Sequence, residues 1–492
     1  MKEANMERKN AWKTYSDTDR KALMTLAESY KGFLTKCKTE RACAKRAIEL
    51  AEASGYIPLD QAIAMGMPLK PGSKVWASNY GKAVMLVQIG TEDIEKGVNI
   101  LGAHIDSPRL DLKQNPLYET NDFVLFDTHY YGGIKNYQWV ALPLALQGVV
   151  VKKDGTVVEI SIGEDPNDPV FCVTDLLPHL GAEQLKKNGR EVVEGENLDV
   201  LIGSEPLIVE SEQGAEAAAD ASKVDEDDMT YEEKIDAMAE KEAVRARVLK
   251  LLLENYGIEE EDFLSAEIEV VPAGAARDCG LDRSMVIGYG QDDRVCAYTS
   301  LEAQLAVKNP RRTAVCILVD KEEIGSVGAT GMTSAFFENT MAEIFNLLEK
   351  PSELLLRRCL ARSSMLSSDV SAAFDPAYAS VFETKNSAYC GRGLVFNKYT
   401  GSGGKSGSND ANAEYMASLR HIMDEAGVNY QTAELGRVNA GGGGTIAYIP
   451  AKYGMNVIDS GVPVLSMHSP WEVTSKADIY EAFKGYVAFL RS

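Results

Sequence analysis

Apolar residues recur along this chain at spacings that predict alternating helices and strands. Residues 17–53 have a helical pattern, because Leu23, Leu26, Tyr30 and Phe33 fall on one face at spacings of three and four. Two short apolar runs follow, KAVMLVQIG at 82–90 and VNILGAH at 98–104, and each is typical of a buried strand. The second run ends abruptly in the polar sequence HIDSPR. Because α/β sheets usually place functional groups at the carboxyl ends of buried strands, this end is a candidate site.

The middle of the chain has a different pattern. The sequence GVVVKKDGTVVEISIG predicts a β-hairpin with its turn at Asp154 and Gly155. An acidic low-complexity stretch at 211–228 predicts a solvated loop. We therefore expect residues 113–257 to form an inserted domain that is rich in β-structure.

Strand and helix patterns alternate again after about residue 260. The strand candidates are EIEVVPAG, RTAVCILVD, LVFNK and PVLSMHS, and the helix candidates are RVCAYTSLEAQLAV, AEYMASLRHIMDEA and SKADIYEAFKGYVAFL. Such alternation is typical of the α/β class. We expect one α/β domain built from residues 1–112 and 258–492 and interrupted by the insert.

Composition and charge narrow the classes of partner. The 492 residues include 73 acidic and 51 basic side chains, a formal net charge of −22, which argues against nucleic acid and anionic membranes as partners. No apolar run reaches the roughly 18 residues that span a bilayer, and the polar start MKEANMERKN lacks the apolar core of a signal peptide. The eight cysteines are scattered without a CxxC pair, as is typical of free buried thiols. We expect a cytoplasmic protein.

Two of the five histidines, His104 and His468, stand at the ends of apolar strand runs. Taken alone, a histidine is more often structural than a metal ligand. In the sequence His-Ile-Asp, however, Asp106 falls on the same side of an extended chain as His104. Its carboxylate can accept the second imidazole N–H and fix the tautomer, as is common beside metal-bound histidines. The alternative is that Asp106 caps a turn before Pro108.

Acidic side chains follow three further strand candidates. Asp292 and Asp293 in GQDDR follow the strand-like run MVIGY, and Glu322 and Glu323 in DKEEIGS follow RTAVCILV. Asp369 ends the weaker apolar segment SSMLSSDV. Adjacent carboxylates repel unless a cation is near, although Arg294 could supply that charge for the Asp pair. Together with the two histidines, these acids form a mixed nitrogen and oxygen donor set that suits Zn, Mn or Co. Two such ions can share one carboxylate and act together in hydrolysis.

The order of these motifs resembles the aspartyl aminopeptidase family of co-catalytic metallopeptidases, which includes yeast aminopeptidase I. The matching motifs are HIDSPRLDLK, GQDDR, DKEEIGS, SSDVSAAFDPAY, GGGGTI and LSMHSPWE. The resemblance implies a three-layer metallopeptidase domain with a mixed sheet, interrupted by an inserted dimerisation domain, and a homo-oligomer that is a tetrahedral dodecamer. It also implies an aminopeptidase that acts on peptides with a free N-terminus and uses two divalent ions. Zinc is the preferred choice of metal, and manganese or cobalt are the alternatives.

The resemblance further implies a role for each site residue. The metal ligands would be His104 with Glu323 on one ion, Asp369 with His468 on the other, and Asp292 as the bridge. Glu322 would be the general base that activates a water, and Asp106 would orient His104. Two positions after Asp369 depart from the family pattern, because Ala372 and Asp375 stand where the family commonly has histidine.

Substrate contacts are predicted at three further positions. If the enzyme favours acidic N-terminal residues, a cation must meet the side-chain carboxylate, and Lys398 is preferred to Lys405 because it ends a strand-like run. Gly443 lies in the run AGGGGT, which either lets the backbone approach a ligand or forms a flexible turn. His179 resembles the family histidine that reaches the active site of a neighbouring subunit; the alternative is a turn residue that packs within its own domain.

Two other functions stay open on the sequence alone. One is a related two-metal amide hydrolase with other substrates. The other is a non-catalytic scaffold of the same fold, although the complete set of predicted ligands and base argues against it.

Overall fold

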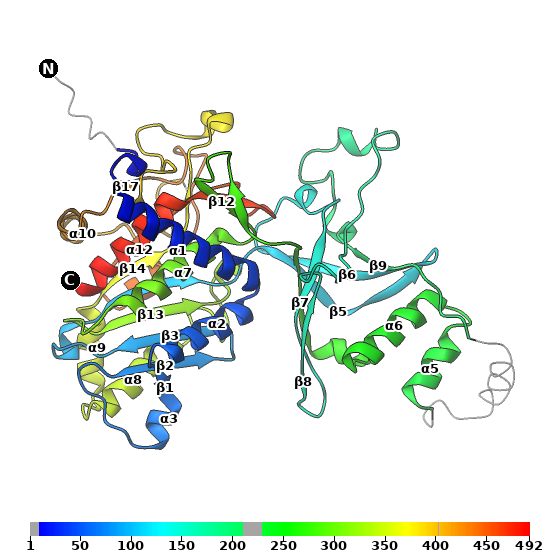
Figure 1. Cartoon of the computed structure of the whole chain (residues 1–492), viewed down its shortest axis with the longest axis horizontal. Helices are drawn as coiled ribbons and strands as arrows, with labels where there is room; N and C mark the ends of the chain where they lie inside the picture. Colours follow the sequence, from blue (N-terminus) through cyan, green and yellow to red (C-terminus); the bar gives the residue numbers. More distant parts are fainter. Residues whose placement is uncertain (1–8, 210–228, 402) are drawn as a thin grey trace. The chain divides into compact units, whose positions relative to one another are not determined.

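The computed structural model describes residues 9–209, 229–401 and 403–492 (Figure 1). The chain separates into two compact units. Unit 1 comprises Met1–Ser107 and Ala275–Ser492, and unit 2 comprises Pro108–Gly274. An interrupted α/β domain is therefore present, as we predicted. Within the described residues, no helix combines the length and the apolar character needed to cross a membrane.

The insert is longer than the predicted range 113–257, and strand pairing gives the reason. The segment EIEVVPAG, predicted in the α/β domain, forms β10 (Ala266–Pro272). This strand pairs antiparallel with two strands of unit 2, so its backbone hydrogen bonds belong to the insert. The predicted loop at 211–228 lies outside the described residues.

A nine-stranded mixed sheet forms the centre of unit 1. Its inner strands β13, β4, β14 and β18 run parallel, and antiparallel strands flank them on both sides. Because parallel strands end at the same edge of a sheet, the residues that follow β4, β13 and β14 are brought together. In sheet order the strands are β1 (Ile57–Pro58), β2 (Lys74–Asn79), β3 (Ala83–Gln88), β13 (Ala314–Val319), β4 (Asn99–His104), β14 (Ser364–Ser368), β18 (Asn456–Gly461), β16 (Leu394–Asn397) and β17 (Tyr430–Thr432).

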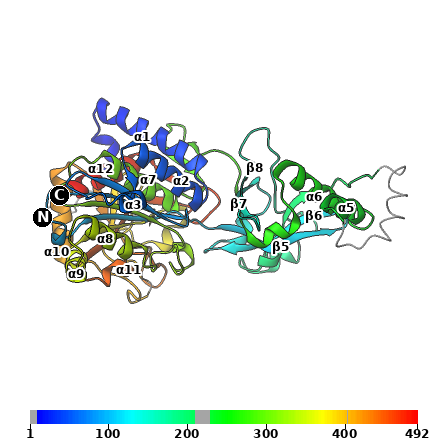
Figure 2. The ribbon, with the colours of Figure 1, turned by 90° about the horizontal axis from the view of Figure 1, so that it is seen from below.

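Helices cover both faces of this sheet, as Figure 2 shows. Successive strand residues point to opposite faces, so Leu101 and Leu318 join one core whereas Ile100 and Ile317 join the other. The first core packs against α1 (Asp17–Lys36), α2 (Glu40–Ala53), α7 (Gln291–Ala306), α10 (Ala413–Glu425) and α12 (Lys476–Arg491). The second packs against α3 (Leu59–Ala64), α8 (Phe336–Leu347), α9 (Glu353–Ala361) and α11 (Tyr448–Ala451). The three-layer arrangement is confirmed.

The helical pattern predicted over residues 17–53 is present and is divided between two helices. Cys37 leaves the helical conformation, with φ −109° and ψ 70°, and ends α1. The Thr39 hydroxyl then accepts a hydrogen bond from the backbone N–H of Ala42 and caps the start of α2.

A second, five-stranded sheet in unit 1 carries two of the loops that form the candidate site. Its central strand β20 pairs antiparallel with both of its neighbours, β12 and β19. In sheet order the strands are β11 (Arg277–Cys279), β12 (Met285–Gly288), β20 (Glu472–Ser475), β19 (Pro463–Leu465) and β15 (Ser371–Ala372).

Among its described residues, unit 2 contains a six-stranded sheet and two α-helices. The predicted hairpin is present, because Val151 of β7 pairs with Val157 of β8 across the turn. In sheet order the strands are β8 (Val157–Ile162), β7 (Leu144–Val151), β10, β5 (Arg109–Thr120), β6 (Phe123–Tyr131) and β9 (Val200–Gly203). The helices are α5 (Tyr231–Met238) and α6 (Ala243–Tyr256).

Candidate metal centre

The last residue of β4 is His104, whose imidazole is buried. Its Nδ1 lies 3.0 Å from the backbone oxygen of Asp106 and 3.3 Å from the Oδ1 atom of the same residue. A proton on Nδ1 is therefore donated to Asp106, and Nε2 is left with its lone pair free to bind a metal. This is the position in which Asp106 would orient His104.

Asp106 also holds the turn that follows β13. Its Oδ1 accepts the backbone N–H of Glu322 at 3.2 Å, and its Oδ2 accepts that of Glu323 at 3.1 Å. One buried carboxylate thus connects the end of β4 to the short 3-10 helix Glu322–Ile324.

Asp292 lies between two imidazoles. Its Oδ1 is 3.2 Å from Nε2 of His104, and its Oδ2 is 3.2 Å from Nε2 of His468. Asp292 has an extended conformation, with φ −80° and ψ 106°, before the regular turns of α7 begin. One oxygen therefore faces each histidine, which is the arrangement expected of a bridging ligand.

Two further acids complete the cluster. The Oδ1 atom of Asp369, just after β14, lies 3.9 Å from Nε2 of His104. On the other side, Oε1 of Glu323 lies 3.6 Å from Nε2 of His468. The ligand atoms of His104, Asp292 and Asp369 lie within 4.8 Å of one another, and so do those of Asp292, Glu323 and His468.

These distances favour a grouping different from the one that the family resemblance implied. Two groups of ligand atoms place His104 with Asp369 and His468 with Glu323, whereas we expected His104 with Glu323 and Asp369 with His468. A third group places His104 with Glu322 and Glu323, so Glu323 also lies near His104. Adjacent β4 and β14 are the reason for the first pair, because they end at the same edge of the sheet.

The chemistry of the cluster fits divalent cations. Burial raises the pKa of both Asp369 and Glu323 well above the usual range of a carboxyl group. The buried Oε1 of Glu323 accepts no hydrogen bond from any described residue. Several carboxylates packed this closely repel one another unless cations offset their charge. The cluster therefore has the imidazole and carboxylate donors of a metal site, and its negative charge needs cations to offset it.

Glu322 is beside the cluster rather than between the histidines. Its Oε2 lies 4.0 Å from Nε2 of His104, and its side chain is 14% exposed. Burial is the main cause that raises its pKa to about 7. A carboxylate with partial access to solvent beside the ligands has the position required of a general base.

The residues predicted to contact substrate, Lys398, Lys405 and Gly443, all interact with other groups of the chain. Lys398 pairs with Asp410, and its side chain is 45% exposed. Lys405 pairs with the same acid at 3.2 Å and lies over the ring of Tyr399. The backbone N–H of Gly443 donates to the carbonyl of Thr400 at 3.1 Å, so that donor is already used within the chain.

His179 belongs to unit 2 and is exposed in a turn, so it is not part of the cluster in unit 1. At the two positions that depart from the family pattern, Ala372 is in β15, and the Asp375 side chain accepts the backbone N–H of Ala377.

One buried acid of the site was not predicted. Glu472 stands four residues after His468 in LSMHSPWE, and its carboxylate contacts the segments of both Asp292 and His468. A charged residue at the start of a buried strand was the available sequence signal.

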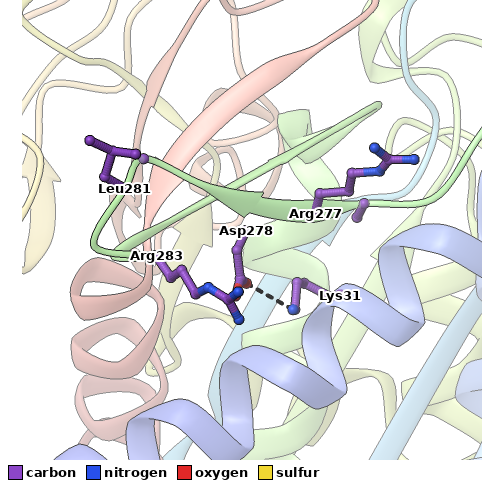
Figure 3. A pocket seen from close by; sticks show the side chains of 7 residues that line it. Lys31, Arg277, Asp278, Leu281 and Arg283 are labelled. Atoms are coloured by element: carbon purple, nitrogen blue, oxygen red, sulfur yellow. Dashed lines mark ion pairs between the residues drawn. The ribbon is translucent and has the colours of Figure 1, made fainter.

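A separate, open pocket of about 520 Å³ lies in unit 1, and Figure 3 shows the side chains that line it. Lys31 Nζ points to Asp278 Oδ1 at 2.8 Å, and Arg277 and Arg283 also line the cavity beside the exposed Leu281. None of the predicted metal ligands lines it, so it is not part of the metal centre.

Comparisons with known proteins identify the family of the chain. A model of the aminopeptidase I zinc metalloprotease family (M18) matches residues 33–490. A probable M18 family aminopeptidase 1 of Clostridium acetobutylicum is 57% identical, over 99% of this chain and 98% of that protein. The crystal structure of an M18 aminopeptidase from Thermotoga maritima has a TM-score of 0.88 and 42% identity, with 99% of each chain covered.

A more distant structure is the S. cerevesiae mApe1 dodecamer, with a TM-score of 0.72, 19% identity and coverage of 94% and 95% of the two chains. At that identity the likeness concerns the fold alone. The predictions of fold, family and enzyme class are confirmed by the relatives of higher identity. The chain belongs to the M18 aminopeptidase I family of zinc metalloproteases and is a metal-dependent aminopeptidase.

Proposed function

We propose that this enzyme removes the N-terminal residue of peptides with two divalent ions that share Asp292. The observation that carries the proposal is the position of Asp292, whose two oxygens each lie 3.2 Å from a different imidazole. A carboxylate shared in this way is the usual bridge of a two-metal hydrolase.

Each ion would have its own ligands besides Asp292. His104 and Asp369 would hold one ion, and Glu323 and His468 would hold the other. The mixture of imidazole and carboxylate favours zinc, and manganese or cobalt would also suit these donors. The family description as a zinc metalloprotease supports the same choice.

The protein residues have distinct roles in the proposed reaction. When bound, divalent ions polarise a carbonyl group and lower the pKa of water. Glu322 would take the proton of the attacking water and later pass it to the departing amine. Asp106 would hold the imidazole of His104 and the backbone of Glu322 in place for this transfer.

The preferred N-terminal residue remains a prediction. Lys398 and Lys405 are the candidate cations for an acidic side chain, and both already pair with Asp410. Gly443 is a weaker candidate, because a Cβ at this position would meet no atom within 4 Å. The cytoplasmic location expected from the sequence also stays a prediction.

A homo-oligomer is the proposed functional state, with unit 2 as the dimerising part and a dodecamer as the complete assembly. The printed description of the S. cerevesiae mApe1 structure as a dodecamer supports this proposal. Unit 2 also exposes several large apolar side chains, among them Leu176, Leu177, Leu180 and Leu185. Exposed apolar side chains that lie this close together in the sequence are candidates for a subunit interface.

The test combines metal removal with a substrate panel. The purified enzyme is dialysed against a chelator and then titrated with Zn²⁺, Mn²⁺ or Co²⁺ while the hydrolysis of aminoacyl and N-acyl amides is followed. We expect activity on aminoacyl amides to be lost and then restored as about two equivalents of metal bind. Activity that survives complete metal removal, or turnover of N-acyl amides alone, would contradict the proposal.

A further inference from the structure

Glu472 is fixed at a point where two site loops meet. It is the first residue of β20, it is 1% exposed, and its backbone pairs with Gly288 of β12. The side-chain amide of Gln291 donates to its carbonyl oxygen at 2.6 Å. Strand pairing and this hydrogen bond together hold the backbone of Glu472 in place.

The carboxylate binds two separate segments. Its Oε2 accepts the backbone N–H of Asp292 at 3.0 Å, and its Oε1 accepts the backbone N–H of His468 at 2.8 Å. His468 has a left-handed backbone conformation with φ 64°, which non-glycine residues adopt only where the surroundings support it. Each oxygen of Glu472 therefore holds the backbone of one metal-site residue.

Asp106 provides the same kind of support on the other side of the cluster. It accepts the backbone N–H of Glu323, while Glu472 accepts those of Asp292 and His468. All three residues of this ligand group are thus held at the backbone by a buried carboxylate.

We propose that Glu472 is a positioning residue for the metal held by Asp292, Glu323 and His468. The inference rests on the two-metal site proposed above. Residues that orient ligands without binding the metal often contribute substantially to metal affinity. A glutamine at this position would keep one acceptor oxygen and turn an NH₂ group toward one of the two N–H donors, so one loop would lose its anchor.

The test measures Zn²⁺ binding to metal-depleted protein by calorimetry for the wild type and Glu472→Gln. We expect the variant to bind the Zn²⁺ of His468 and Glu323 with an affinity about 10–100-fold lower. The other Zn²⁺ should lose less affinity, because it shares only Asp292 with the loops that Glu472 holds. Added Zn²⁺ should restore much of kcat, with KM less affected. If the wild type does not bind two ions, the proposed function fails, whereas two unchanged affinities in the variant would overturn the role of Glu472 alone.

Asp478 offers a matched control in the same unit. It is fully buried, and it accepts the backbone N–H groups of Gly391 and Gly393 at 2.6 and 2.7 Å. Asp478→Asn should lower Tm without changing Zn²⁺ affinity, because the loop that contains Gly391 and Gly393 carries no predicted ligand. Equal losses of affinity in both variants would overturn the proposal. If Glu472→Gln does not fold, Glu472→Asp is measured, and wild-type affinities in that shorter variant would also count against it.

Discussion

Glu322 and Glu323 are neighbours in the sequence but have different surroundings. Glu323 faces His468 with a buried oxygen that accepts no hydrogen bond from the described residues. Glu322 lies beside His104 at 4.0 Å and keeps 14% of its side chain exposed. At the scale of single residues, this difference supports the proposed roles of Glu323 as a metal ligand and Glu322 as the general base.

Replacing Glu322 by glutamine should therefore abolish most turnover and leave metal binding intact. Loss of the base should lower kcat by about 10²–10⁴-fold, while the Zn²⁺ content of the purified protein stays at the wild-type level. Glu323→Gln is the matched variant and should lose Zn²⁺ affinity. A kcat of Glu322→Gln near that of the wild type would contradict these assignments. So would an equally low Zn²⁺ content in Glu322→Gln and Glu323→Gln.

A second residue-scale feature is the buried carboxyl group of Asp459 in β18. The Thr445 hydroxyl donates to its Oδ1 at 2.6 Å, whereas Oδ2 accepts no hydrogen bond from the described residues. Burial is the main cause that raises the pKa of Asp459 from 3.8 to about 7. The folded chain therefore keeps a proton that the unfolded chain releases near pH 4.

This difference makes stability depend on pH. Between about pH 4 and pH 7 the folded state binds one more proton, so its stability falls as pH rises, by up to about 1.4 kcal/mol per pH unit. Asp459→Asn removes this fall in stability, because the amide does not titrate. The difference in Tm between the variant and the wild type, measured by calorimetry, should therefore increase in favour of the variant from pH 5 to pH 7. The exposed Asp424→Asn controls for the lost acid. A Tm difference that does not change with pH would show that Asp459 does not titrate in this range.

At the scale of elements, strand ends were predictable and side-chain directions were not. The apolar runs before His104, Glu322 and Asp369 correctly indicated buried strands that end in polar groups. The pairing of ligands was not predictable, because it depends on β13, β4 and β14 lying side by side and parallel. The assignment of β10 to the α/β domain was wrong for the same reason. The pattern of apolar and polar residues within a strand does not determine which strands it pairs with.

Glu472 illustrates a further limit. Glu472 stands in the motif LSMHSPWE, but its carboxylate binds the backbone N–H of Asp292, which is 180 positions away in the sequence. Contacts over such a distance follow from sheet topology, and local residue patterns do not specify them. The break between α1 and α2 was, by contrast, readable in principle, because Thr39 is a good cap.

The loop between β16 and α10 gives the prediction at this scale. If it forms the pocket for an acidic side chain, Lys398→Ala should lower the ratio of kcat/KM for Asp over Leu substrates by about 2–10-fold, as expected for a partly exposed ion pair. Lys405→Ala is the control and should change the ratio less, because its amine also lies over Tyr399. An unchanged ratio for Lys398→Ala would exclude Lys398 from specificity.

At the scale of the whole molecule, the proposed assembly would depend on unit 2. The turn around His179 is exposed, and Leu176, Leu177 and Leu180 beside it are 47–68% exposed. A second copy of the chain could bury these apolar side chains. His179 would then be held at an interface, where an imidazole can donate to the developing oxyanion of a partner's reaction.

Subunit mixing tests whether His179 acts across that interface. His179→Ala and Glu322→Gln proteins should each bind Zn²⁺ and have little activity. Random mixing into dimers should restore roughly one quarter of the sites, because half of the dimers are mixed and each has one site with an intact base and an intact partner histidine. Two affinity tags used in succession isolate the mixed oligomers, and mixing Glu322→Gln with an inactive double variant is the control. Mixed oligomers that stay inactive would show that His179 does not act in a neighbouring subunit.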